Sequence, residues 1–216
     1  MVSLLHGIDP QIIAFLGVAT ALTIAPGADT ILVLKNSVRG GRNYGWMTIA
    51  GILSGCLVHA VLSAVGLSVI LMRSALAFQV VKLAGAAYLI WIGIRTFRSG
   101  GGEETAPDPE SPLRAGASLA SAFREGLMTN VLNPKVSVFY LAFLPQFISP
   151  GDPVLAKSVL LACIHSLLGA VWLGTLAAVA ARGRVWMSRP RVRRAISRVS
   201  GAVLVGLGAR LAIERR

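Results

Sequence analysis

Long apolar runs separated by short basic stretches dominate the pattern of the chain. A helix needs ~20 mainly apolar residues to cross the hydrocarbon core of a bilayer. Six runs meet this requirement: roughly Gln11–Leu34, Trp46–Met72, Ala75–Phe97, Leu127–Ile148, Val154–Ala181 and Ala195–Ile213. The pattern therefore predicts an all-α polytopic membrane protein with six transmembrane helices.

The first and fourth runs are each interrupted by a proline. Pro26-Gly27-Ala28-Asp29 lies in the first run, and Asn133-Pro134-Lys135 lies in the fourth. Proline has no N–H and its ring clashes with the carbonyl four residues earlier, so an unbroken helix is not expected at either place. Asparagine is a good N-cap and proline suits the first helical position. We expect a new half-helix to begin at Asn133, with exposed N–H groups and a positive dipole end.

Composition supports a membrane domain. The chain has 216 residues, of which 55% are apolar and 14% charged, whereas soluble domains carry about a quarter charged residues. The N-terminus lacks a basic n-region and its apolar run exceeds signal-peptide length, so we expect no cleaved signal. The net charge of +12 comes from basic residues in short connections. This distribution is typical of membrane orientation, and we expect no nucleic-acid partner.

Most of the lysines and arginines fall in alternate connections, at 35–45, 95–124 and 182–198. The positive-inside rule places these loops in the cytoplasm and both termini outside. If the interrupted first run did not cross, the N-terminus would instead lie inside. The arginine-rich stretch 182–198 would also meet anionic lipid headgroups.

A Gly-, Pro- and acid-rich stretch divides the chain near its midpoint. We read 99–118 as a flexible cytoplasmic linker between two three-helix repeats, 1–98 and 119–216. Phe15 and Phe123, Pro26 and Pro134, and Gly66 and Gly174 are pairs with one common spacing. Since three spans is an odd number, the second repeat must be inverted relative to the first. Inverted repeats with interrupted helices 1 and 4 are typical of secondary transporters.

Two charged residues accompany the breaks. Asp29 lies within a predicted span, and an acidic residue in such a position is by default a candidate functional residue. Alternatively, Asp29 caps the half-helix that follows. Lys135 either serves the site or extends its stem to the cytoplasmic interface. In a third interpretation, the two side chains pair when the site is empty and separate as substrate enters.

These features suit a small zwitterion, because Asp29 offers a counter-charge for a cation and helix N-termini favour an anion. Thr20, Thr129 and Asn130 add neutral hydrogen-bonding groups, although Ser and Thr often bond only their own helix backbone. The expected substrate-binding set is therefore Thr20, Pro26, Gly27, Asp29, Thr129, Asn130, Asn133, Pro134 and Lys135. We expect a transporter rather than an enzyme, with no catalytic residue and no cofactor.

The chain contains three further motifs: Ala25-Pro26-Gly27 with Asp29 and Arg39-Gly40-Gly41-Arg42; Gly126 to Lys135 with Phe143-Leu144-Pro145-Gln146-Phe147; and Gly85 to Gly93. Together these motifs resemble those of the LysE/RhtB family of amino-acid exporters. Ala28 stands where the family often has a second proline, which softens the first break. The resemblance implies a bacterial inner-membrane exporter of amino acids or close derivatives, driven by the proton gradient or the membrane potential.

His59 and His165 lie near Cys56 and Cys163 in the second and fifth runs. The Cys163–His165 spacing of i, i+2 does not share a helix face, which weighs against a metal site. His59 and Asp29 are candidates for a proton relay. Two other functions remain as alternatives: a transmembrane thiol oxidoreductase that uses Cys56 and Cys163, and a metal-ion exporter. Glycine-rich third and sixth runs allow close packing within one chain or in a homo-oligomer.

Overall fold

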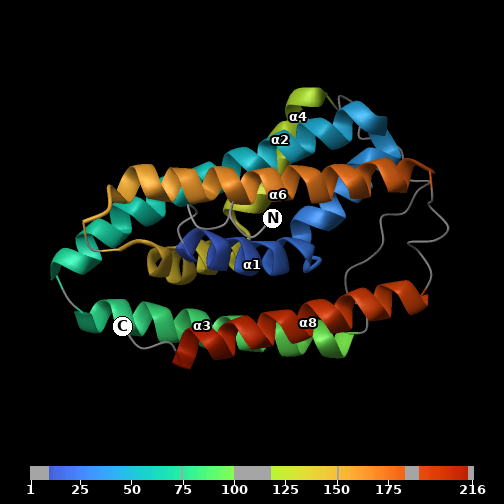
Figure 1. Cartoon of the computed structure of the whole chain (residues 1–216). Helices are drawn as coiled ribbons and strands as arrows, with labels where there is room; N and C mark the ends of the chain where they lie inside the picture. The colour runs from blue at the N-terminus through green and yellow to red at the C-terminus, as the bar shows by residue number, and fades with distance from the viewer. Residues whose placement is uncertain (1–9, 74, 100–117, 150, 183–189, 214–216) are drawn as a thin grey trace, which may run out of the picture.

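The computed structural model describes residues 10–73, 75–99, 118–149, 151–182 and 190–213, and among these residues every regular element is helical (Figure 1). The predicted all-α class is therefore confirmed, and helices cover all six apolar runs. The linker 100–117 and the arginine-rich stretch 183–189 lie outside the described residues. The elements are α1 (Pro10–Ile24), α2 (Ala28–Arg73), α3 (Ala75–Ser99), α4 (Leu119–Val131), α5 (Pro134–Val138), the π-helix η2 (Phe139–Phe143), the 3₁₀-helix η3 (Leu144–Phe147), α6 (Val154–Arg182) and α8 (Pro190–Ile213).

The first apolar run is broken where its proline lies. Helix α1 ends at Ile24 and α2 begins at Ala28, so the backbone is non-helical at 25–27. Helix α2 then contains a second discontinuity at Gly41, with φ 77° and ψ −172°. Only glycine adopts such a conformation without steric cost. The arms 28–40 and 42–73 meet at this corner (Figure 1), and the Ser37 side chain lies directly against Gly45.

The prediction of a basic loop at 35–45 is therefore wrong. The chain is helical up to Gly40 and again from Arg42, and Gly41 alone makes the turn between these two arms. The turn is this short because one left-handed glycine redirects the chain. Lys35, Arg39 and Arg42 consequently lie on the two helical arms rather than on an irregular connection.

The fourth apolar run is broken at the expected place. Helix α4 ends at Val131, and α5 begins at Pro134 with Asn133 as its N-cap. The helical segment Pro134–Phe147 is bent by 50° from α4. It passes from α-helical to π-helical and then 3₁₀ geometry before Ile148, so this half-helix is irregular along its length.

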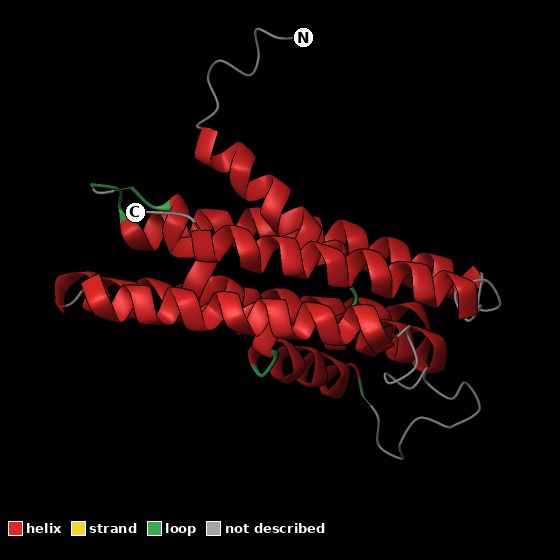
Figure 2. Cartoon of the chain, turned by 90° about the horizontal axis from the view of Figure 1, so that it is seen from below, coloured by secondary structure: helices red, strands yellow, loops and turns green. Residues whose placement is uncertain are grey.

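The helices form two layers with the broken segments between them. Helix α2 packs mainly against α4 and α6 on one side, and α3 packs against α8 on the other. Figure 1 shows α3 and α8 side by side below α2 and α6, and Figure 2 shows the long helices running alongside one another. Helix α1 contacts both α6 and α8, and η2 contacts both α2 and α3. Helix α1 and the half-helix that follows Pro134 thus lie between the layers, whereas α4 lies on the outer side of α2 (Figure 1).

An aromatic cluster fills the centre between the layers. The Phe15 ring lies 5.8 Å from Phe139 and 5.2 Å from Phe147, measured between centroids. Phe139 also lies edge-on to Tyr140 and stacks on Phe143. Phe15, Phe139 and Tyr140 are fully buried. These contacts anchor α1 to the half-helix that follows Pro134.

Close backbone contacts hold the helix pairs together. A Cβ atom on Gly51 or Gly126 would collide with the backbone of the opposite helix, at Phe123 and Thr48 respectively. In the other layer, Gly93 and Gly201 meet backbone to backbone. Small residues allow this approach between membrane helices. The glycines expected to allow close packing thus serve contacts within this chain.

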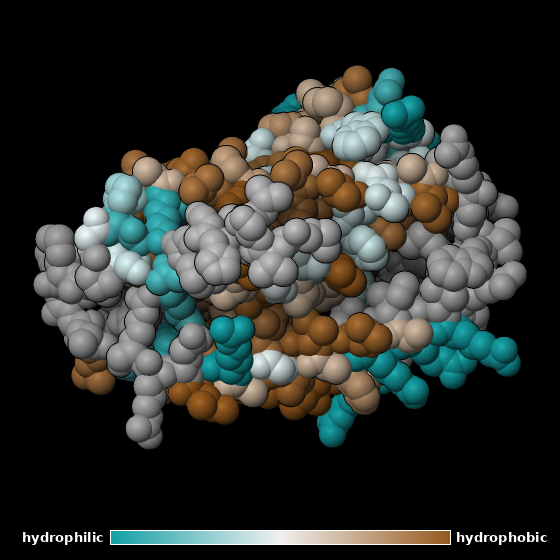
Figure 3. Space-filling view, in the orientation of Figure 1, coloured by the Kyte–Doolittle hydropathy of each residue, from teal (hydrophilic) through white to brown (hydrophobic). Residues whose placement is uncertain are grey.

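The apolar surface fits a membrane environment. Ala28–Gly66 and Val154–Val179 are long and apolar enough to span a bilayer, and the bent pair Leu119–Val131 with Pro134–Phe147 makes a third candidate. Leu62, Leu167 and Val171 are exposed over more than half of their surface. Figure 3 shows apolar residues across the middle of the visible face. Lipid would cover such surface.

Candidate functional site at the two helix breaks

The two breaks lie against each other in the folded chain. The Lys135 ammonium donates to the carbonyl oxygen of Ala25 at 2.8 Å and to that of Leu22 at 3.3 Å. Helix α1 cannot satisfy the Leu22 carbonyl itself, because the residue four positions later is Pro26, which has no N–H. A cation at a helix C-terminus is also favoured by the helix dipole. Lys135 therefore caps the end of α1 from the other half of the chain.

The second break shows the converse arrangement. The Asn130 carbonyl lacks its α-helical donor because residue 134 is proline. It accepts from the backbone N–H of Asn133 at 3.0 Å and contacts His59 Nε2 at 3.1 Å. His59 belongs to the first half of the chain. In both breaks, a carbonyl left open by proline is thus bonded by a side chain from the opposite half.

Asn133 organises the start of the new half-helix. Its side-chain oxygen accepts from the Lys135 N–H at 3.1 Å, and its carbonyl accepts from Ser137 at 2.9 Å. Asn133 and Pro134 therefore occupy the N-cap and first helical positions, as predicted. The N-cap places the Lys135 side chain toward α1, where Gly27 leaves room. A Cβ on Gly27 would lie 3.3 Å from the Lys135 ammonium.

Asp29 is bonded to the same region of α4. The Asn130 side-chain amide donates to Asp29 Oδ2 at 2.9 Å. Asp29 Oδ1 and Asn130 Oδ1 are buried and meet the geometric criteria for a hydrogen bond with none of the described residues, although the Asn133 side chain is near enough to act on Asp29 and Asn130 Oδ1 lies against Gly55. The Lys135 charge is near enough to act on Asp29 electrostatically. Buried polar atoms are normally bonded, so two open acceptors beside a cation are typical of a ligand site.

A small cavity of about 40 Å³ lies at this junction. Its volume suits a few water molecules, so in this conformation the partly open space is smaller than an amino acid. The cavity brings together both breaks and the facing parts of α2 and α6. Its lining residues are Leu22, Thr23, Asp29, Thr30, Ile52, Leu53, Cys56, Asn130, Lys135, Val136, His165, Gly169 and Leu173.

The structure brings only part of the expected residue set to the cavity. Asp29, Asn130 and Lys135 line it. Pro26, Gly27, Asn133 and Pro134 shape the backbone beside it, and His59 contacts Asn130 from outside the lining. Thr20 on α1 and Thr129 on α4 are half-buried and do not line it.

Tyr140 and His165 form a hydrogen-bonded pair beside the cavity that sequence reasoning missed. The Tyr140 hydroxyl lies 3.1 Å from His165 Nδ1, and the Tyr140 ring stacks on His59. The sequence places His59 and His165 in the second and fifth runs, but it does not identify Tyr140 as the residue that contacts both. The signal available was an isolated tyrosine in an apolar run one turn after Lys135.

The cysteines are both free thiols. Cys56 is buried and lines the cavity, whereas Cys163 is exposed on α6. Within the described ranges, no three His, Cys, Asp or Glu side chains gather in a way that would hold a metal ion. Neither observation favours a thiol oxidoreductase or a metal-ion exporter.

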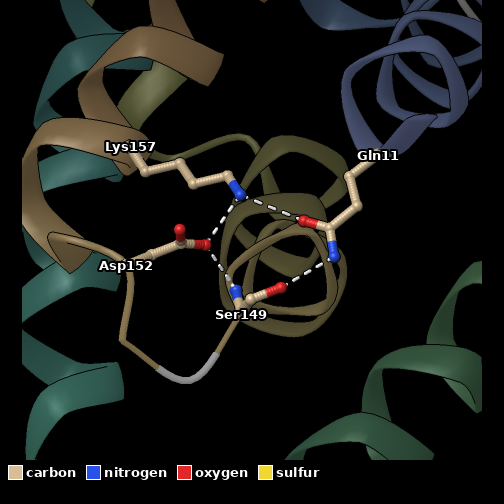
Figure 4. Close-up of polar contacts among 4 residues, drawn as sticks. All are labelled: Gln11, Ser149, Asp152 and Lys157. Atoms are coloured by element: carbon tan, nitrogen blue, oxygen red, sulfur yellow. Dashed lines mark hydrogen bonds and ion pairs between the residues drawn. The ribbon is translucent and has the colours of Figure 1, made fainter. Parts of the chain in front are cut away.

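A second polar cluster joins the start of α1 to the start of α6 (Figure 4). Lys157 pairs with Asp152 at 2.7 Å and donates to Gln11 at 3.0 Å, and Gln11 donates to Ser149 at 2.8 Å. The hydrogen bond from Lys157, together with that from the Ser149 N–H, lowers the pKa of Asp152 below its ordinary value. This polar cluster holds α1 against the segment that follows η3.

An apolar helical protein whose interrupted helices meet at a small cavity, with a carboxylate, an amide and an ammonium in its lining, has the architecture of a membrane transport protein. The chain belongs to the family of LysE type translocators, whose model matches residues 20–215. This confirms the family resemblance and supports transport and efflux.

Two relatives illustrate the family. A homoserine/homoserine lactone efflux protein of Salmonella typhimurium is 34% identical over 202 residues, covering 94% of this chain and 96% of its own length. An uncharacterized membrane protein of Bacillus subtilis, YrhP, is 31% identical over 209 residues, covering 94% and 99%. No solved structure matches the chain.

Proposed function

We propose that this protein is a secondary active exporter of amino acids or close derivatives across the bacterial inner membrane. The observation that carries the proposal is the contact between the two helix breaks, where Asp29, Asn130 and Lys135 line one cavity. The efflux relative supports the substrate class, since its name includes homoserine and homoserine lactone. The same set of groups suits any small zwitterion.

Each end of a zwitterion finds a partner in the cavity. Asp29 Oδ1 and Asn130 Oδ1 are open acceptors that suit an ammonium group. The Lys135 ammonium suits a carboxylate. In this structure, Lys135 bonds the α1 carbonyls instead. We propose that substrate entry draws Lys135 partly away from α1 and loosens the first break.

We propose that the chain has six spans arranged as two inverted repeats, and that this arrangement brings the two helix breaks together at the site. Pro26 and Pro134 interrupt the first helix of each proposed repeat. Helix α2 packs on α6 and α3 packs on α8, so the second and third helices of one repeat meet their counterparts in the other. We propose that the basic segments 35–45, 95–124 and 182–198 face the cytoplasm and that both termini lie outside.

The coupling group is Asp29, with His59 as its relay partner. Asn130 lies between them, bonding Asp29 through its side chain and His59 through its carbonyl. A proton arriving at Asp29 removes the charge that the substrate ammonium requires. Proton binding and substrate binding would therefore compete at one carboxylate, which is the condition for exchange of the two across the membrane.

Export is tested in cells that accumulate amino acids from fed dipeptides. The intracellular concentration of each amino acid is measured with and without the protein. The proposal predicts that the protein lowers the accumulation of at least one small polar amino acid. Homoserine is one of the compounds tested. Equal accumulation of every amino acid, with the protein inserted in the membrane, would contradict the proposed function.

A further inference from the structure

His165 is a polar residue of the cavity lining to which the proposed function gives no role. It lies on α6, is 7% exposed, and lines the cavity with Asp29, Asn130 and Lys135. It therefore faces the same small space from the side opposite the helix breaks. An imidazole is neutral or cationic and can donate or accept a hydrogen bond, so its orientation decides what it offers.

Tyr140 fixes that orientation. Its hydroxyl lies 3.1 Å from His165 Nδ1. Tyr140 itself is held firmly, because its ring is fully buried and stacks on His59 at 5.6 Å between centroids, and its carbonyl accepts from the Ser63 hydroxyl at 2.5 Å. The imidazole is thus anchored through one nitrogen by a side chain that has little freedom to move.

The direction of this hydrogen bond sets the tautomer. His165 Nδ1 lies at hydrogen-bond distance from the Tyr140 hydroxyl, and the Cys56 side chain also bonds this hydroxyl. When the Tyr140 hydroxyl donates, Nδ1 accepts and Nε2 carries the hydrogen of the neutral ring, and the inference uses this tautomer. The described residues supply no partner for Nε2, so its N–H is available to a molecule in the cavity.

Building on the proposed function, we propose that His165 is a substrate-binding residue whose Nε2–H donates to the substrate carboxylate, and that Tyr140 positions it. The cavity then has two donors, Lys135 and His165, and two open acceptors, Asp29 Oδ1 and Asn130 Oδ1. The donors match a carboxylate and the acceptors match an ammonium. His165 thereby gives the site a preference for substrates that carry a free carboxylate.

The test compares homoserine with homoserine lactone, which keeps the ammonium but has no carboxylate. Binding of each compound to the purified full-length protein is measured by calorimetry. In His165→Leu, the affinity for homoserine should fall on the order of tenfold or more, because a hydrogen bond to a charged group is lost. The affinity for the lactone should fall by a clearly smaller factor. An equal fall for both compounds, or no fall, would overturn the inference.

Three further variants separate positioning from folding. His165→Gln keeps an N–H near the place of Nε2 and should recover most of the homoserine affinity. Tyr140→Phe frees the ring and should reduce the preference for homoserine over the lactone by a few-fold. Cys163→Ser, on the exposed face of the same helix, should bind both compounds like the wild type. Failure of His165→Gln to recover any preference would count against the hydrogen-bonding role.

The two proposals fail in different ways. If the wild-type protein bound neither compound and changed no amino-acid level in cells, the proposed function would fall, and this inference with it. If the wild type bound and exported homoserine but His165→Leu retained the same ratio of affinities, only the role of His165 would be wrong.

Discussion

The Lys135 ammonium lies 2.8 Å from the carbonyl oxygen of Ala25, across 110 residues of sequence. This contact joins the second helix break to the first. Its counterpart is the contact between His59 and the Asn130 carbonyl. Each half of the chain thus completes the hydrogen bonding that proline leaves open in the other half. Neither break is fully satisfied without the opposite half.

Replacing Lys135 should damage both stability and transport. Lys135→Met keeps the aliphatic stem but leaves the Leu22 and Ala25 carbonyls without the ammonium, and an unsatisfied buried group costs about 1–3 kcal/mol. We expect a lower melting temperature and at least a tenfold loss of efflux. Lys135→Arg retains the charge and should be the milder variant. Wild-type stability in Lys135→Met would show that the ammonium does not cap α1.

Asp29→Asn should abolish transport while leaving insertion intact. The amide keeps the volume and still accepts from Asn130, but it cannot supply the counter-charge for a substrate ammonium. We expect efflux in the dipeptide assay to fall to the level without the protein, with normal amounts in the membrane. Asp152→Asn, outside the cavity, is the matched control for loss of a carboxylate. Near-normal efflux in Asp29→Asn would reduce Asp29 to a helix cap.

Pro134→Ala should partly rejoin the broken helix. Alanine restores an N–H that can bond the Asn130 carbonyl, which now contacts His59. The new bond would compete with His59 and turn Lys135 relative to α1. We expect efflux to fall several-fold and substrate affinity to change. Pro153→Ala, in the loop before α6, is the control. Unchanged substrate affinity in Pro134→Ala would contradict the broken-helix account.

Gly126→Val should prevent the close contact of α4 with α2. Even a Cβ at this position would collide with the Thr48 backbone, and backbone cannot move aside as a flexible side chain can. We expect a strong loss of folded protein, measured as the monodisperse fraction after solubilisation. Gly17→Val is the control, because a Cβ at Gly17 has open space around it. Equal yields from both variants would refute the backbone contact.

The polar cluster at the start of α6 should contribute to stability in a pH-dependent way. The pKa of Asp152 is lowered from its ordinary value of 3.8 in the folded state. Its contribution is therefore present above that ordinary value and lost as the pH falls through the lower folded value. Asp152→Asn should melt at a lower temperature than the wild type at pH 7, and the difference should vanish in strong acid. A constant difference at every pH would exclude the ionised carboxylate as its cause.

Much of the site could be predicted from local sequence. Asn133 and Pro134 form the N-cap and first turn because these residues have strong positional preferences. The family was recognisable because its motifs are continuous stretches. The prediction of a loop at 35–45 is wrong, since basic residues and three glycines suggest an irregular connection, whereas a turn at Gly41 with positive φ suffices.

The sequence by itself determined that the chain is helical and apolar, that two helices break, and that a carboxylate and an ammonium accompany the breaks. These properties follow from proline chemistry and hydrophobic run length, which act over a few neighbouring residues. Only the tertiary structure decided that Lys135 caps α1, that His59 bonds the Asn130 carbonyl, and that His165, which contacts Tyr140, lines the same cavity as Asp29. The partners in these contacts are far apart in sequence, and helix packing alone selects which of them meet.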